Sequence, residues 1–133
     1  MTQDKQIMII ALGIVTVWDT FTTITGTAEI LGGSGIAFFL SILFALMITA
    51  ILIKTIPIMY HPRKDFLYTG AKLLWGLAFL YDLFTSFIGN RGLIETGGND
   101  FGFAQVIVTI GMTIFVTSSP IAISYLLNPN LTE

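Results

Sequence analysis

Four stretches of mainly apolar residues dominate the hydrophobic and polar pattern of the chain, and short polar or glycine-rich segments separate them. Their residue ranges are 6–25, 36–53, 66–88 and 101–127. A helix of about 20 residues, rising 1.5 Å per residue, crosses the roughly 30 Å hydrocarbon core of a bilayer. The pattern therefore predicts an all-α, polytopic integral membrane protein with four transmembrane helices.

The segments between these stretches carry turn-forming or charged residues. Residues 27–35 are rich in glycine and predict a turn, and residues 90–100 predict a glycine-rich loop. The second apolar stretch continues past Pro57 to Tyr60, so we expect a kink or fraying near its end. Residues 61–65 are the most charged part of the chain and predict a loop.

One polar motif occurs twice inside the apolar stretches. Residues 18–26 read WDTFTTITG, residues 81–89 read YDLFTSFIG, and the offset between the copies is 63 positions (82 − 19). Pro57 and Pro120 share the same offset. We therefore expect a single membrane domain, residues 1–133, built from two helical hairpins: repeat 1 covers about 6–62 and repeat 2 about 66–129. Because an even number of spans separates the copies, the repeats are parallel.

Each copy of the motif places a carboxyl, two hydroxyls and a glycine along one helix face. An ionised carboxyl facing lipid would cost several kcal/mol, so this face must point at another helix or at water. Both aspartates should lie about 10 Å inside the outer ends of their helices. The predicted intramembrane polar site is Asp19, Thr22, Thr23, Asp82, Thr85 and Ser86, and the predicted helix-packing glycines are Gly13, Gly26, Gly76 and Gly89.

Three interpretations of the polar face compete. In the first, each aspartate is neutral and hydrogen-bonds across helices, while glycine permits close packing. In the second, paired carboxylates and hydroxyl oxygens form a hard-oxygen site for a proton or a small cation. In the third, a helix, cofactor or lipid of another molecule docks between the copies. We do not expect an enzyme, because the sequence has no phosphate-binding loop, Ser-His pair or metal-ligand spacing.

Composition narrows these possibilities further. Hydrophobic residues make up 54% of the chain and charged residues 11%, well below the share of about 25% in soluble domains. A net charge of −2 argues against nucleic acid as a partner. The chain has no cysteine and one histidine, His61, which we interpret as a loop residue at the membrane interface. No cofactor is expected.

The positions of the basic residues predict the orientation in the membrane. Four spans place both termini and the central loop on one side. By the positive-inside rule both termini are cytoplasmic, and we expect a bacterial or organellar inner-type membrane. Lys5, Lys54, Arg63, Lys64 and Lys72 fall on the side of the termini, and Arg91 falls on the other.

Together these observations predict a small structural or assembly subunit of a homo-oligomer or a larger membrane complex. The lipid bilayer and other membrane subunits are the expected partners, and the aspartate and threonine faces would mediate helix association. The alternative is a small ion or proton channel or transporter whose polar pathway is lined by Asp19 and Asp82. A membrane-disrupting toxin is a further class, but no feature of the sequence favours it.

Overall fold

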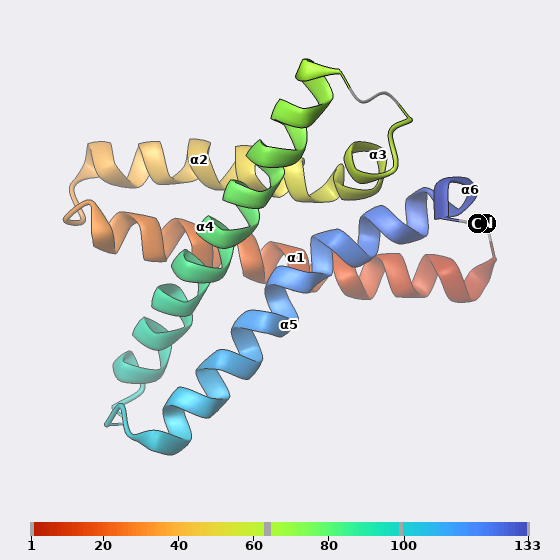
Figure 1. The fold of residues 1–133 in the computed structure, drawn as a ribbon. Coiled ribbons are helices and arrows are strands. Elements are labelled where there is room, and N and C mark those ends of the chain that lie inside the picture. Colours follow the sequence, from red (N-terminus) through yellow and green to blue (C-terminus); the bar gives the residue numbers. More distant parts are fainter. Residues whose placement is uncertain (1, 63–64, 99, 133) are drawn as a thin grey trace.

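The computed structural model describes residues 2–62, 65–98 and 100–132, and every element that it describes is a helix (Figure 1). The all-helical class is confirmed, and four of the helices are long and apolar enough to cross a membrane, as expected of an integral membrane protein. The predictions that concern Arg63 and Lys64 lie outside the described residues. The helices are α1 (Gln3–Ile30), α2 (Gly35–Ile53), α3 (Thr55–Met59), α4 (Phe66–Thr96), α5 (Phe103–Leu127) and α6 (Pro129–Thr132).

Side-chain caps start three of the long helices where the sequence provides an oxygen. Thr2 accepts a hydrogen bond from the backbone N–H of Lys5 at the start of α1. Ser34 and Asp65 do the same for α2 and α4. Such caps satisfy backbone donors that have no partner inside the helix. The turn before α2 contains two glycines at positive φ, Gly32 and Gly33, as a tight turn between helices requires.

Two helices are longer than the apolar stretches predict. α1 continues to Ile30 and α4 continues to Thr96, so the predicted turn at 27–35 and loop at 90–100 both begin later than expected. Polar residues in the last turns do not end these helices. The helical backbone hydrogen bonds continue until the glycines with positive φ, Gly32 after α1 and Gly98 after α4. As a result Asp19 and Asp82 lie about 16 Å and 21 Å from the ends of their helices rather than about 10 Å.

The bundle has two distinct ends (Figure 1). The chain termini lie together at one end, which we call the terminal end, and the α1–α2 and α4–α5 turns lie on the opposite side, the turn end. α1 contacts α2, α4 and α5, and its most extensive contact is with α4. Figure 1 shows α4 crossing α1 near the middle of both helices.

The protein is polar inside and apolar outside. Large hydrophobic side chains such as Phe39, Leu74 and Phe115 are exposed, as they are in a protein whose surroundings are lipid. Buried hydrocarbon residues form a small cluster at the terminal-end side of the crossing, made by Ile48, Leu52 and Ala78. Much of the remaining buried volume among the described residues is taken by hydroxyl, amide and carboxyl side chains.

The two prolines at equivalent sequence positions have different effects. Near Pro57 the second span breaks: α2 ends at Ile53 and the short helix α3 follows. α5 instead continues through Pro120. Proline leaves the carbonyl four residues earlier without its usual donor. In α5 the hydroxyl of Ser119 donates to that carbonyl, the one of Val116, at 2.6 Å, which accounts for the uninterrupted helix.

Candidate functional site

α1 and α4 touch backbone to backbone at the predicted glycines. A Cβ built on Gly26 would lie 2.0 Å from the carbonyl oxygen of Thr85, and one built on Gly89 would lie 2.3 Å from the carbonyl oxygen of Thr22. No side chain fits at either position, so glycine is what allows the helices to approach this closely. The predicted packing role of these two glycines agrees with the geometry.

Gly13 and Gly76 do not share this role within the chain. A Cβ added at either position would meet nothing within 4 Å. The predicted helix-packing role of Gly13 and Gly76 is therefore not seen between the helices that the structure describes.

Because the helices approach closely, each aspartate accepts a hydrogen bond from a hydroxyl side chain of the opposite helix. Thr23 of α1 donates to Asp82 Oδ1 at 2.6 Å, and Ser86 of α4 donates to Asp19 Oδ1 at 3.0 Å. The two hydroxyl oxygens are themselves 3.2 Å apart. All four side chains are at most 1% exposed. We call Asp19, Thr23, Asp82 and Ser86 the carboxyl clasp, because each helix holds the carboxyl of the other.

The remaining two predicted site residues support the clasp in different ways. Thr22 donates to the backbone carbonyl of Asp19 at 2.9 Å, and its hydroxyl lies 3.2 Å from that of Ser86. The hydroxyl of Thr85 bonds within its own helix, to the carbonyl of Tyr81 at 2.9 Å. Thr85 therefore contributes to the crossing through its backbone, which contacts Gly26.

One oxygen of each carboxyl is left unmatched. Asp19 Oδ2 and Asp82 Oδ2 are both buried and have no hydrogen-bond partner among the described residues. The hydroxyls of Thr23 and Ser86 that bond to the two carboxyls are 3.2 Å apart, so the carboxyls are neighbours, and the described side chains that bond to them are the hydroxyls of Thr23, Ser86 and Thr117. An unpartnered charge in such a place is very unfavourable, and two adjacent negative charges are worse. One proton shared between the carboxyls would relieve both problems.

The described residues contain no group of three or more His, Cys, Asp or Glu side chains that could hold a metal ion. The hydrogen bonds that described residues donate to the two carboxyls come from the neutral hydroxyls of Thr23, Ser86 and Thr117.

The structure adds a contact from α5 that the sequence reading missed. Thr117 donates to Asp19 Oδ1 at 3.4 Å, so a third helix reaches the carboxyl clasp. Thr109, Thr113 and Thr117 are buried at four-residue spacing along α5. That spacing in an otherwise apolar stretch was the available signal, because it places three hydroxyls on one helix face.

Asn90 was also missed, since it was assigned to a loop. It lies inside α4, is fully buried, accepts from Trp18 Nε1 at 3.2 Å and donates to Thr113 at 3.3 Å. In the corresponding contact from α4 to α1, the hydroxyls of Tyr81 and Thr27 are 2.8 Å apart. The aromatic residue before each aspartate thus bonds to a polar side chain of the opposite helix.

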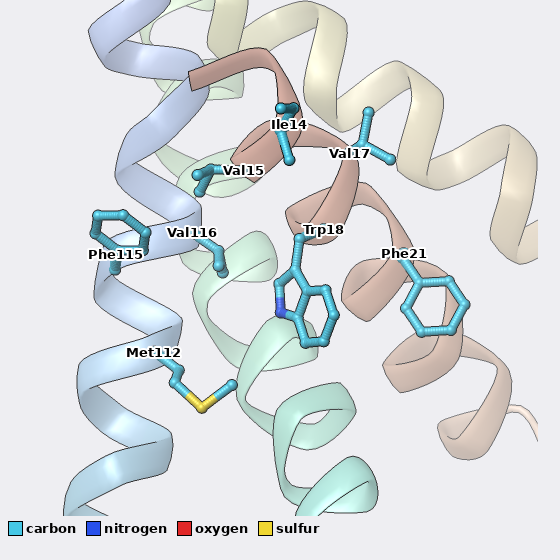
Figure 2. Close-up of a pocket in the computed structure, with 8 residues that line it drawn as sticks. All are labelled: Ile14, Val15, Val17, Trp18, Phe21, Met112, Phe115 and Val116. Atoms are coloured by element: carbon cyan, nitrogen blue, oxygen red, sulfur yellow. The ribbon is translucent and has the colours of Figure 1, made fainter. Parts of the chain in front are cut away.

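Apolar side chains separate this polar interior from the surroundings. Figure 2 shows a groove between α1 and α5, of about 590 Å³, whose lining includes Trp18, Phe21, Met112 and Phe115. The ring of Trp18 forms part of the groove, and its N–H bonds inward to Asn90. Trp18 therefore presents hydrocarbon to the groove and a donor to the interior.

Comparisons with protein-family models, with curated proteins and with solved structures find no match to this chain.

Proposed function

We propose that the chain is a small structural subunit of a membrane assembly, made of two parallel helical hairpins held together by the carboxyl clasp. The observation that carries this proposal is reciprocity at a constant sequence offset. Thr23 bonds to Asp82, and Ser86, which is 63 positions after Thr23, bonds to Asp19. A duplicated hairpin that pairs with its own copy produces such reciprocal contacts.

Two further pairs of contacts between α1 and α4 follow the same offset of 63 positions. Gly26 meets the backbone of Thr85, and Gly89 meets that of Thr22. Trp18 bonds to Asn90, and its counterpart Tyr81 bonds to Thr27. Every residue named in one contact of a pair is 63 positions from its counterpart in the other.

The polar faces are used within the chain, so assembly has to use the outer surface. That surface is rich in exposed Phe, Leu and Ile side chains, and it carries grooves such as the one in Figure 2. We expect other copies of this chain or other membrane helices to pack there, with both termini on the cytoplasmic side as the basic residues indicate.

The test of the assembly is the mass of the full chain in mild detergent. We expect complexes of more than one copy by native mass spectrometry. Asp19→Asn should leave the mass unchanged, because the amide keeps an oxygen that accepts from Ser86. A chain that stays a strict monomer in detergents that preserve other membrane oligomers would contradict homo-oligomer assembly.

The second candidate function is an ion or proton pathway, and the unmatched Oδ2 atoms favour it. A purely structural contact is served as well by asparagine, whereas a pair of carboxyls can bind and release a proton. The test is proton and sodium flux in vesicles that contain the chain. Flux should disappear in the Asp19→Asn, Asp82→Asn double variant at unchanged assembly mass. Flux that survives in this variant would rule the pathway out.

A further inference from the structure

The two sides of the carboxyl clasp differ in their access to the surface. At the turn end a small pocket of about 200 Å³ lies between α1 and α4. Glu29 and Thr96 at its rim are exposed, and its lining also includes Thr25 and the buried Gly89. Glu29 places a proton-exchanging carboxyl at the entrance of this pocket.

Polar groups of Thr25, Thr22 and Ser86 lie between this pocket and Asp19. Thr25 donates to the backbone carbonyl of Thr22 at 3.1 Å. The hydroxyl of Thr22 donates to that of Ser86 at 3.2 Å, and Ser86 donates to Asp19 at 3.0 Å. The contact between Thr25 and Thr22 runs through the backbone, so the hydroxyl series itself begins at Thr22.

On the terminal-end side of the clasp, hydrocarbon packs between α2 and α4. The cluster of Ile48, Leu52 and Ala78 lies there, and the side chains of Trp75 and Phe79 pack against it. The hydroxyls next to Asp19 in this direction bond to one another or to backbone: Thr16 pairs with Ser119 and Thr20 with Thr49, each at 2.9 Å, and Ser119 donates to the carbonyl of Val116. A proton that reached the clasp from the turn end would meet the apolar cluster on the side of α2 and α4.

We propose that Asp19 and Asp82 form a proton-binding site that is loaded from the turn end through the pocket at Glu29. The proton leaves a hydronium ion in the pocket, which becomes water, and is taken up by the carboxyl pair, where Asp19 Oδ2 and Asp82 Oδ2 share it. The groups that face the pair are each other and the hydroxyls of Thr23, Ser86 and Thr117. The site rests on the carboxyl clasp of the proposed function, and it requires neither oligomer formation nor conduction.

The proton can be observed directly by infrared spectroscopy of the full chain in phosphatidylcholine–phosphatidylglycerol vesicles. A buried protonated carboxyl gives a C=O stretching band that shifts when the proton is exchanged for deuterium. We expect such a band in the native chain, a change in its frequency in both Asp19→Asn and Asp82→Asn, since the remaining buried carboxyl keeps a proton of its own, and loss of the band in the double variant. A native chain without the band, or a band unchanged in both variants, would overturn the proposal.

The route of loading is tested by the rate at which this band shifts in deuterated buffer. Thr22→Val removes a hydroxyl on the turn-end side and should slow the exchange by about tenfold, the factor expected from the loss of one hydrogen bond of the series. Thr25→Val, at the half-buried pocket wall, should act in the same direction. Thr16→Val is the matched control, since it removes a buried hydroxyl on the terminal-end side and should leave the rate unchanged.

Three results would contradict the route or the ligand. Equal slowing by Thr22→Val and Thr16→Val would mean that access is not one-sided. A lack of effect of Thr22→Val and Thr25→Val, with both variants melting like the native chain, would mean that the pocket is not the entrance. A band that responds to sodium at constant pH would identify a metal cation as the ligand. Assembly mass, measured in parallel, reports separately on the proposed function.

Discussion

Two pairs of helices, α1 with α4 and α2 with α5, differ in what they bury. α1 and α4 bury the same set, an aspartate, a hydroxyl residue and a glycine, and contact each other reciprocally. α2 and α5 do not match. α5 buries several hydroxyl residues, among them Thr109, Thr113 and Thr117, whereas α2 buries one, Ser41, beside Ile48 and Leu52.

This difference indicates that the two pairs of helices have different roles: α1 and α4 hold the halves of the chain together, and α2 and α5 determine how the carboxyls are reached. Holding the two halves together requires the same groups on both helices, and α1 and α4 supply them. Access to the carboxyls requires a polar side and a closed side, which two identical second helices would not provide. The symmetric part is where mutations should affect stability most.

The largest expected effect is at the glycines of the crossing. Gly89→Ala would place a methyl group against the carbonyl of Thr22, and we expect it to lower the free energy of unfolding by about 3 kcal/mol, as overpacking against backbone does. Gly26→Ala should be as damaging. The control is Gly76→Ala, which meets nothing within 4 Å. Denaturant titration in detergent micelles measures all three, and equal stability of Gly89→Ala and Gly76→Ala would contradict the crossing.

The next largest effect is at the aspartates. Asp82→Leu leaves the buried hydroxyl of Thr23 without its acceptor, and we expect a loss of about 2 kcal/mol. Asp82→Asn keeps an acceptor oxygen and should lose much less. Thermal unfolding followed by circular dichroism compares the two variants. If Leu and Asn were equally stable, the hydrogen bond would contribute nothing to holding the halves together.

A smaller effect distinguishes the second helices. Ser119→Ala removes the donor to the carbonyl that Pro120 leaves open, so we expect a loss of about 1 kcal/mol. Ser118→Ala is the neighbouring control, because Ser118 is exposed and bonds to a carbonyl of its own helix. The two variants are compared by the same denaturant titration. A more damaging Ser118→Ala would show that Ser119 does not sustain α5 through the proline.

The smallest expected effect concerns the aromatic residues before the aspartates. Trp18→Phe and Tyr81→Phe each remove one cross-helix hydrogen bond, to Asn90 and to Thr27. Each should cost about 0.6 kcal/mol, the average for such bonds in membranes. Trp18→Phe also loses ring area, so Tyr81→Phe gives the cleaner value. If Tyr81→Phe left the free energy of unfolding unchanged, the hydrogen bond between Tyr81 and Thr27 would contribute nothing to holding α1 and α4 together.

The sequence predicted the helices well because hydrocarbon length is a strong signal in a membrane protein. The class and the four long apolar helices are confirmed. Helix ends were less predictable: Asn90 and Glu95 look like loop residues, yet both lie inside α4. Polar residues can extend a helix beyond the apolar stretch, and the pattern contains no information on how far.

The sequence singled out residues that the structure brings together, and their role as a functional site stays a prediction. The duplicated motif identified both aspartates and the hydroxyls that face them, because repetition of a costly residue inside an apolar stretch indicates a shared role. It could not identify Thr117, whose counterpart at the same offset is Lys54. The contact of Thr117 depends on how α5 packs against α1, and the sequence of α5 contains no second copy from which this packing could be inferred. The parallel repeat and the assembly stay predictions.

The most direct test of the carboxyl clasp is a double-mutant cycle on the free energy of unfolding. Asp19→Leu and Ser86→Ala, at positions 67 residues apart whose side chains share a bond of 3.0 Å, should show a coupling of about 0.6 to 1.7 kcal/mol, because each single variant removes that bond. The same-helix pair Asp19→Leu and Thr23→Ala should show a smaller coupling. A coupling near zero between Asp19 and Ser86 would contradict the account.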